Sequence, residues 1–416
     1  MTQKRLVLVV GAIVWLFAIA RTDRPELNAA EARAGIDGTT DQTIQPAGGR
    51  ASAAISAFAP ISTHGGLVYV SGILPSEPVP TDFTTQTIRV LDELKARLVG
   101  AGTTIDRVAS TSVYLASAED FPALNAVWAR YWPAAPPART TVVALLPVSG
   151  ARIQVSAIAA APGRRRALVV PAGWAAPAGP FSYAIRAGDT VFLSGLVPRR
   201  GADNTLVNGD IEAQTSGVFE NAEAILMATG LSFADVVSSR VFLTDGAVFD
   251  RMNAVYRTRF PAGPPARATV ITPLVSPDFL IEITMVAVKA PDRAAIITPN
   301  DDGSPGRPNA NLSSAIRVGP RLFLSGMLGV VPGKGPDAMA QSTETLNRLD
   351  RTLTAAGFGW TDVTESVVYL TDVSAAPAVQ LGIAARTRGR MPAGTVVGTG
   401  LVNPDGRVEI MLTAGK

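Results

Sequence analysis

Apolar residues recur along most of the chain in two rhythms, and each rhythm predicts one kind of element. Residues 85–102 carry apolar side chains every three or four positions, which predicts an amphipathic helix. The apolar stripe, which should face a sheet, consists of Ile88, Leu91, Leu94 and Leu98. Residues 108–115, VASTSVYL, alternate at every second position and are rich in β-branched side chains, as half-buried strands are. The pattern therefore predicts a protein that contains both helices and strands.

The same pattern occurs three times. LVYVSGILP at residues 67–75 corresponds to TVFLSGLVP at 190–198 and to RLFLSGMLG at 321–329. The interval between copies is the size of a domain and far exceeds the unit of a solenoid. We therefore infer three tandem modules.

Each copy continues through the same series of elements. The first helix ends where the chain must turn into a left-handed conformation, at Gly102, Gly230 and Gly357. A strand, a second helix and two strands follow, so each module reads strand, strand, helix, strand, helix, strand, strand. Pro- and Gly-rich segments separate the copies. The predicted modules are residues 50–162, 179–291 and 311–416, of which the last is degenerate, and the linkers are 163–178 and 292–310.

The first 49 residues differ from the rest. Residues 1–5 supply two positive charges, residues 6–20 are uncharged and mostly apolar, and Ala18-Ile19-Ala20 fits a cleavage signature. This predicts a signal peptide over residues 1–20, a flexible spacer over 21–49, and an exported protein that is periplasmic or extracellular. The apolar run is shorter than the ~20 residues of a membrane-spanning helix. If it is not cleaved, residues 6–20 instead anchor the protein to a membrane.

Composition removes several kinds of chemistry. The 416 residues include no cysteine and one histidine, His64 in a turn-like STHGG stretch, which excludes thiol nucleophiles, disulfides and Cys/His zinc sites. We expect neither a metal nor an organic cofactor. The net charge is +3, and the one dense basic cluster, Arg164–Arg166, lies in a linker without interleaved aromatic residues. We interpret this cluster as solvated and expect no nucleic-acid partner.

One short motif carries a charge in two modules and lacks it in the third. PPAR spans residues 136–139 and again 264–267, whereas the matching MPAGT has Gly394 in place of the arginine. Proline fixes the backbone before each arginine, so Arg139 and Arg267 can present a rigid guanidinium fork to a carboxylate. Retention in two modules and loss in one favours a ligand site.

Together these motifs resemble the RidA/YjgF family of reactive-intermediate deaminases, also labelled L-PSP endoribonucleases. The motifs are SG…P, QT, AG, YL, DF..LN..W..YWP, PPAR and IQVSAIA; modules 1 and 2 match most of the family's length, and module 3 mainly in its first half. The resemblance implies chorismate-mutase-like α+β modules that normally form trimers, with a barrel-like sheet core, helices outside and ligand clefts between neighbours. Three copies in one chain then imply a monomeric, intramolecular pseudo-trimer.

The resemblance also implies a site for a small imino or keto acid. In the family, the PPAR arginine binds the ligand carboxylate and an acidic residue on the last strand handles a water. By position, the clamp is Arg139 or Arg267, and the acidic position is Gln154, Glu282 or Glu409 in the three modules. Only module 2 keeps both groups, so we interpret Arg267 and Glu282 as the catalytic pair and Arg139 as substrate-binding. It remains open whether clamp and acid come from different modules and meet across an interface.

Further positions carried over from the family line the predicted clefts. In module 2 they are Phe181, Ser194, Gly195, Asn253 and Thr269, and the module 1 counterparts are Phe58, Ser71, Gly72, Asn125 and Thr141. In module 3 the aromatic residue is replaced by Leu312 and the asparagine by Gln380, so that cleft least resembles an active one. The residue after Ser-Gly is apolar in all three modules, which predicts a dry pocket.

The resulting hypothesis is an exported protein that binds small 2-imino and 2-keto acids. It would hydrolyse imines or enamines to 2-keto acids and ammonia, because imines need only be held beside an oriented water. Two alternatives stay open. In the first, the clefts are vestigial or bind a carboxylate without turnover. In the second, Arg267 and Glu282 form a buried ion pair on neighbouring strands.

Overall fold

A computed structural model describes residues 58–261, 263–289 and 291–416 of the chain. The predicted signal peptide, residues 1–20, and the predicted spacer, residues 21–49, lie outside these ranges. Within the described ranges, no helix is both long enough and apolar enough to cross a membrane.

Module 1 is a five-stranded mixed sheet with two helices. Its elements are β1 (Ile61–His64), β2 (Leu67–Ile73), α1 (Phe83–Gly100), β3 (Val108–Leu115), α2 (Phe121–Tyr131), β4 (Ala138–Val143) and β5 (Ile153–Ala160). The strand order is β1-β2-β5-β3-β4, in which β3 and β4 are parallel and the other neighbours are antiparallel. The last strand of the module therefore lies in the middle of its sheet.

Modules 2 and 3 repeat this order. Module 2 comprises β7 (Ala184–Ala187), β8 (Thr190–Leu193), α3 (Ile211–Ala228), β9 (Val236–Leu243), α4 (Phe249–Arg259), β10 (Ala266–Ile271) and β11 (Ile281–Val288). Module 3 comprises β13 (Ala315–Val318), β14 (Arg321–Leu324), β15 (Met327–Leu328), α5 (Ala338–Ala355), β16 (Val363–Leu370), α6 (Ala376–Thr387), β17 (Ala393–Gly398), β18 (Gly400–Leu401) and β19 (Val408–Gly415). As in module 1, the last long strand lies beside the hairpin formed by the first two strands of the module: β11 lies beside β8, and β19 lies beside β14.

The first helix of each module begins and ends through local chemistry. An aspartate caps each N-terminus by accepting a hydrogen bond from a backbone N–H group of the first turn; the caps are Asp82, Asp210 and Asp337. The residues predicted to end these helices, Gly102, Gly230 and Gly357, have φ of 74°, 72° and 77°. A side chain would strain this left-handed conformation.

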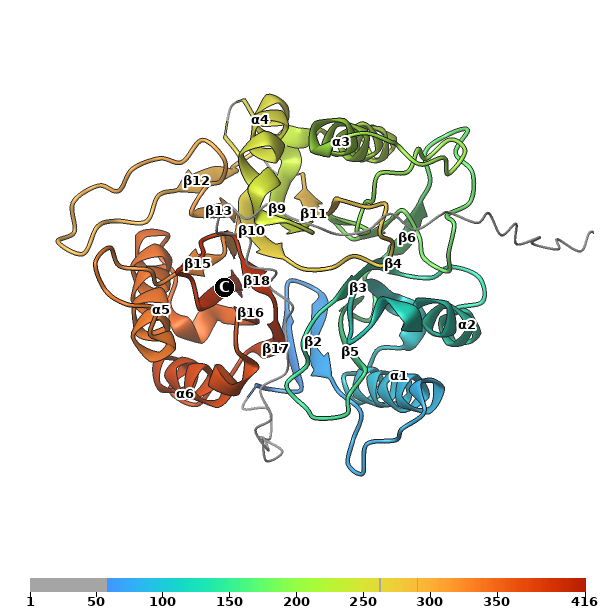
Figure 1. The fold of residues 1–416 in the computed structure, drawn as a ribbon, viewed down its shortest axis with the longest axis horizontal. Helices are drawn as coiled ribbons and strands as arrows, with labels where there is room; N and C mark the ends of the chain where they lie inside the picture. The colour runs from blue at the N-terminus through green and yellow to red at the C-terminus, as the bar shows by residue number, and fades with distance from the viewer. Residues whose placement is uncertain (1–57, 262, 290) are drawn as a thin grey trace, which may run out of the picture. The chain divides into compact units, whose positions relative to one another are not determined.

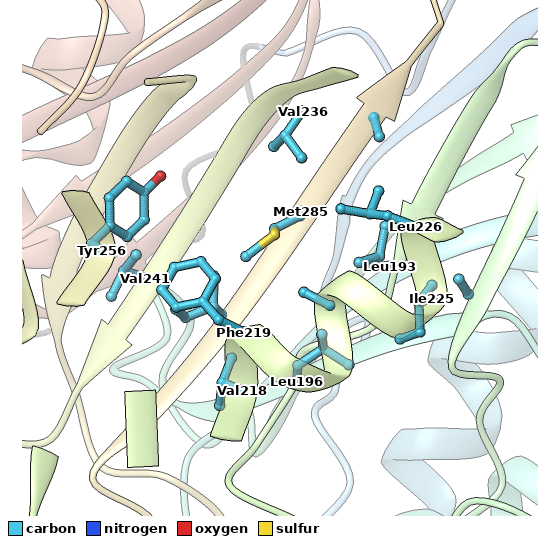
Figure 2. Packing of buried hydrophobic residues seen from close by; sticks show 14 of the residues in the cluster. Leu193, Leu196, Val218, Phe219, Ile225, Leu226, Val236, Val241, Tyr256 and Met285 are labelled. Atoms are coloured by element: carbon cyan, nitrogen blue, oxygen red, sulfur yellow. The ribbon is translucent and has the colours of Figure 1, made fainter. Parts of the chain in front are cut away.

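Each helix pair covers one face of its own sheet. In α1, the predicted stripe is fully buried at Leu91, Leu94 and Leu98, whereas Ile88 is only partly buried. In module 2, Figure 2 shows Phe219 of α3 among side chains that include Val241 and Met285 of the sheet. Burial of these apolar surfaces provides the main driving force for folding of each module.

The predicted linkers contain more structure than their Pro and Gly content indicates. Residues Arg166–Val169 form β6 and Ala294–Ile296 form β12. Each adds an antiparallel edge strand to the first hairpin of the following module. Short β-branched or apolar runs inside these linkers explain the pairing.

The interpretation of Arg164–Arg166 as a solvated cluster is wrong for Arg166. Its guanidinium donates hydrogen bonds to the backbone carbonyls of Val108 (2.8 Å) and Ala135 (2.8 Å). Arg293 in the next linker donates to carbonyls at the equivalent positions of module 2. These arginines satisfy one carbonyl group at the start of β3 or β9 and one in the loop that leads into each PPAR motif.

The three modules form one pseudo-trimer within the chain. Their sheets join edge to edge through short pairings. Val142 pairs with Leu274, Leu145 pairs with Gly398, and residues 270–271 of β10 pair with residues 400–401 of β18. The inner faces of the sheets share an apolar cluster that includes Tyr114, Phe242 and Tyr369, one from each module. The helix pairs lie outside the sheets (Figure 1). This is the α+β architecture that the sequence predicted.

Candidate functional site

The PPAR motif of module 1 begins β4 at the boundary with module 2. The N–H group of Ser182 donates to the carbonyl of Pro137 (3.0 Å), and the N–H group of Arg139 donates to Oγ of Ser194 (2.9 Å). The N–H group of Gly195 in turn donates to the carbonyl of Arg139 (3.1 Å). Module 2 therefore fixes the backbone around Arg139.

The side chain of Arg139 is buried on a bed of aromatic rings. It is 4% exposed, and its Cζ lies 5.2, 5.5 and 5.7 Å from the ring centroids of Trp128, Phe121 and Phe181, respectively. These distances permit cation–π attraction. Nη2 donates to Oδ1 of Asn125 (2.6 Å), whereas Nη1 has no hydrogen-bond partner among the described residues. The guanidinium is thus positioned but only partly satisfied.

Glu282 of module 2 reaches the same place from β11. It is 2% exposed, and its Oε1 accepts a hydrogen bond from the N–H group of Thr141 on β4 (3.2 Å). A Cβ at residue 195 would overlap Oε1, so Gly195 leaves room for the carboxylate. Burial raises the pKa of Glu282 to about 8, although the Thr141 hydrogen bond and the charge of Arg139 oppose this shift. Both protonation states are therefore accessible near neutral pH.

Burial also perturbs the arginine. It lowers the pKa of Arg139 to about 9, because the cation is removed from water, and the negative charge of Glu282 opposes this change. Arg139 therefore remains a cation at neutral pH. Among the described residues, no ion pair within 4.0 Å includes Arg139 or Glu282.

Arg139 and Glu282 line one cavity of about 290 Å³ between modules 1 and 2. Its other walls are mostly apolar or backbone and include Phe121, Thr141, Phe181, Gly195, Val197 and Phe279. A single water needs only about 10–15 Å³ of such space, so the cavity can admit a small molecule. We call the set of Asn125, Arg139, Phe181 and Glu282 the Arg139 site.

The same arrangement recurs between modules 2 and 3. The N–H group of Arg267 donates to Oγ of Ser325 (2.8 Å), and the N–H group of Gly326 donates to the carbonyl of Arg267 (3.1 Å). The acidic residue here is Glu409, which the backbone of Thr269 binds. Burial raises the pKa of Glu409 to about 8. We call Asn253, Arg267 and Glu409 the Arg267 site.

The Arg267 site is less complete than the Arg139 site on the aromatic side and has more unpartnered polar atoms. By repeat position, Leu312 of module 3 takes the place of Phe181. The Cζ of Arg267 lies 4.5 Å from the ring centroid of Tyr256. Nε and Nη1 of Arg267, and both polar side-chain atoms of Asn253, are buried without partners among the described residues.

Between modules 3 and 1 the backbone arrangement persists without the charge. The N–H group of Gly394 donates to Oγ of Ser71 (2.7 Å). A Cβ at residue 394 would overlap the ring of Phe58, which is 5% exposed, so this ring fills the space beside the glycine. Gln154 takes the acidic position, with Nε2 2.7 Å from where a Cβ on Gly72 would lie. We call Phe58, Gln154 and Gly394 the Gly394 site.

Arg267 and Glu282, which we interpreted from the sequence as one catalytic pair, lie in different sites. β9 separates their strands, because Arg267 pairs with Ser239 and Glu282 pairs with Phe242 on β9. Two strand spacings, about 10 Å, therefore lie between the two backbones. The strands are not neighbours, so the ion-pair alternative is wrong. Clamp and acid instead meet across module interfaces, the arrangement that the sequence left open.

The structure divides the predicted lining residues among the three interfaces. The Arg139 site draws together Asn125, Thr141, Phe181, Ser194 and Gly195. Asn253 and Thr269 accompany Arg267, and Phe58, Ser71 and Gly72 accompany Gly394. No predicted cleft is built from a single module.

The sequence expectations included Phe181 but missed the aromatic residues of the second helix that lie beside the arginines. Phe121 and Trp128 lie four residues before and three residues after Asn125, on one face of α2. Phe249 and Tyr256 flank Asn253 in the same way. A signal was present, because module 3 replaces the three positions together, by Ala376, Gln380 and Ile383.

Comparisons with known proteins agree with the fold and the repeats. The sequence profile of the family described as Endoribonuclease L-PSP matches residues 48–161, 174–289 and 304–416. A RutC family protein of Sulfurisphaera tokodaii is 42% identical over 113 residues, which are 27% of this chain and 90% of that protein. Protein DfrA of Myxococcus xanthus is 44% identical over 112 residues, 26% of this chain and 86% of that protein.

Several solved structures resemble a single module of the chain. The crystal structure of RidA from an Antarctic Psychrobacter species is 32% identical, covers 30% of this chain and 99% of its own, and has a TM-score of 0.28. The YjgF gene product of E. coli is 29% identical, covers 30% of this chain and 98% of its own, and also has a TM-score of 0.28. With the family profile matched three times in succession, the chain belongs to the RidA/YjgF (L-PSP) family and consists largely of three tandem domains of that family.

Proposed function

We propose that the chain binds 2-imino and 2-keto acids at the Arg139 site and hydrolyses the imines to 2-keto acids and ammonia. One observation carries this proposal. The buried guanidinium of Arg139 and the buried carboxyl group of Glu282 line one cavity of about 290 Å³ without forming an ion pair with each other. A buried polar group without a partner is costly, and a ligand carboxylate would supply the partner that Nη1 of Arg139 lacks.

The walls of the cavity suit a small organic acid. Asn125 orients the guanidinium through Nη2, so Nη1 is held for the ligand. Phe181 and Val197 offer apolar surface to the rest of the molecule. Fixing the acid by its carboxylate would place the imine carbon at a constant position relative to Glu282.

Hydrolysis requires water to add to the imine carbon and ammonia to leave. The ionised Glu282 takes a proton from the attacking water and returns it to the imine nitrogen, which gives the carbinolamine. A second proton transfer, from the new hydroxyl group to the nitrogen, accompanies cleavage of the carbon–nitrogen bond. The products are a 2-keto acid and ammonia. A carboxyl group with a pKa of about 8 can take and return a proton near neutral pH.

The Arg267 site carries the same two groups and is a second candidate for the same reaction. Its unpartnered atoms on Arg267 and Asn253 are also suited to a polar ligand. Leu312 replaces the aromatic wall there, so we expect weaker binding than at the Arg139 site.

The test uses the full chain and 2-iminobutanoate generated in situ from 2-aminobutanoate by an amino acid oxidase. Trapping with semicarbazide measures how long the imine survives. The unmodified protein should shorten this lifetime, and Glu282→Gln should lower the catalysed rate by roughly 100-fold, the usual contribution of a general base. Glu409→Gln is the matched variant at the Arg267 site and should have the smaller effect.

A binding measurement separates catalysis from binding alone. Calorimetry with 2-oxobutanoate should show that Glu282→Gln still binds the acid, because Arg139 remains. If the unmodified protein binds 2-oxobutanoate but does not accelerate imine decay, the sites bind carboxylates without turnover. If it does neither, the proposed function is wrong.

A further inference from the structure

A second arginine, Arg199, lines the same cavity as Arg139 and Glu282. It follows β8 of module 2, a few residues after Gly195. Arg199 is half-buried, whereas Arg139 is 4% exposed, so Arg199 is the more accessible of the two arginines. The proposed hydrolysis gives Arg199 no task.

The charge of Arg199 is not compensated by a carboxylate. It belongs to none of the ion pairs among the described residues. Nη1 donates to the backbone carbonyl of Asn204 (2.8 Å), and Cζ lies 5.5 Å from the ring centroid of Phe279. A guanidinium has five N–H groups, so donors remain for a further partner.

The surroundings hold Arg199 in place. Asn204, which accepts its hydrogen bond, has a φ of 60° and donates from Nδ2 to the carbonyl of Ala176 (2.8 Å). Oδ1 of Asn204 accepts a hydrogen bond from the hydroxyl group of Tyr183 (3.2 Å). The phenyl ring of Phe279 also lies within cation–π distance of the guanidinium. Such preorganisation lowers the entropy lost when a ligand binds.

Neither Arg199 nor Phe279 has a counterpart in the other modules. The position equivalent to Arg199 is occupied by Ser76 in module 1 and by Val330 in module 3. The position equivalent to Phe279 is occupied by Ala151 in module 1 and by Gly406 in module 3. If Arg199 and Phe279 served a structural role common to all three modules, the other modules would also have an arginine and an aromatic residue at these positions. It therefore belongs to the Arg139 site alone.

From this geometry we propose that the Arg139 site takes 2-imino and 2-oxo acids that carry a second anionic group, which Arg199 binds. The inference rests on the proposed function of the site and names its substrate class. A substrate with one carboxylate would neutralise Arg139 and leave Arg199 facing the cavity without a counter-charge. The apolar side chains of Phe181, Val197 and Phe279 line the same cavity and suit a short methylene chain between the two anions.

The experiment compares 2-oxobutanoate with a series of diacids by calorimetry on the full chain. The series is oxaloacetate, 2-oxoglutarate and 2-oxoadipate, which differ only in the number of methylene groups. We expect one of the diacids to bind about tenfold more tightly than 2-oxobutanoate, the effect of one charge-assisted hydrogen bond. Arg199→Gln should bring that affinity ratio close to one. Arg200→Gln, a change at the adjacent exposed arginine outside the cavity, should keep it.

The outcomes distinguish this inference from the function on which it rests. If 2-oxobutanoate binds as tightly as every diacid, or if Arg199→Gln leaves the ratio unchanged, Arg199 does not select the substrate and only this inference is overturned. If no 2-oxo acid binds, the proposed function and this inference fall together. Kinetics with the imines of glutamate and 2-aminobutanoate provide the second readout, and the preference should appear in KM.

Discussion

The Arg139 site and the Gly394 site are built on the same backbone and differ in their side chains. In both, a serine hydroxyl from the next module accepts a hydrogen bond from the first residues of the PPAR-type strand: Ser194 binds Arg139, and Ser71 binds Gly394. The acidic position is Glu282 in the first site and Gln154 in the second. In the Arg139 site, the ring of Phe181 lies beside the arginine. In the Gly394 site, the ring of Phe58, at the corresponding position, fills the space beside the glycine.

This comparison separates assembly from chemistry. The serine contact is present at all three interfaces, including the one without an arginine, so it serves to join modules. The arginine, asparagine, aromatic pair and glutamate are lost together where module 3 meets module 1. Joint loss of these groups, while the scaffold around them stays, supports our proposal that they bind a ligand.

The largest expected effect comes from removing the charge that distinguishes the sites. Arg139→Met should lower the affinity for 2-oxobutanoate by roughly 100-fold, because one or two charge-assisted hydrogen bonds are lost. Calorimetry measures this change. Arg267→Met is the matched variant at the Arg267 site. Unchanged affinity in the double variant would show that neither arginine is the clamp.

The pH dependence of catalysis tests whether Glu282 acts as the base. Its pKa is raised to about 8 and that of Arg139 is lowered to about 9. The base must be ionised and the clamp cationic, so kcat/KM should rise about tenfold per pH unit below pH 8 and fall above pH 9. Glu282→Gln should remove the rising limb. If kcat/KM instead rises near the ordinary pKa of glutamate, Glu282 with its raised pKa is not the base.

The pH dependence of stability follows from the same shift. Burial raises the pKa of Glu282 above its value in the unfolded chain, so the folded state holds the proton more tightly. The stability linked to this proton is present below the ordinary pKa of glutamate and is lost as the pH rises through about 8. Urea unfolding at several pH values should show the decrease, and Glu282→Gln should reduce it.

A smaller effect on activity is expected from the glycine that makes room for the carboxylate. Gly195→Ala places a Cβ where Oε1 of Glu282 lies, and the flexible end of the glutamate must move. We expect a loss of about tenfold in kcat with little change in stability, because a shift of about an ångström misplaces the base. The matched variant Gly72→Ala crowds Gln154 in the Gly394 site and should leave the activity unchanged.

The smallest effect on activity should come from the Gly394 site itself. Gly394→Ala drives a Cβ into the ring of Phe58, and overpacking of a buried ring should cost about 1–3 kcal/mol of unfolding free energy. The activity should remain. Thermal unfolding measures the loss, and adding Phe58→Ala should make the two changes non-additive. A Gly394→Ala protein of normal stability would show that the ring does not fill this space tightly.

Much of the fold could be predicted because its signals are local. The stripe of Leu91, Leu94 and Leu98 follows from helical periodicity, and the φ values of Gly102 and its two counterparts follow from the chemistry of helix ends. Repetition of these signals predicted three modules. The strands within the linkers were missed, since Pro and Gly outweighed the short runs that pair with a hairpin folded elsewhere in the sequence.

The sequence predicted which arginines and glutamates belong to the candidate sites, but not which arginine shares a site with which glutamate. The positions of Arg139, Arg267, Glu282 and Glu409 follow from repeat alignment. Which arginine faces which glutamate depends on β9 lying between β10 and β11, a property of sheet order that sequence spacing does not contain.

The sequence by itself determined three copies of one module, the loss of charge at Gly394 and the side chains available at each interface. Only the tertiary structure decided that each site combines two modules, that Arg139 meets Glu282, and that Arg199 shares their cavity. The physical reason is the range of the interactions involved. Periodicity and helix capping act over a few residues, whereas sheet order and module packing bring together groups more than a hundred residues apart.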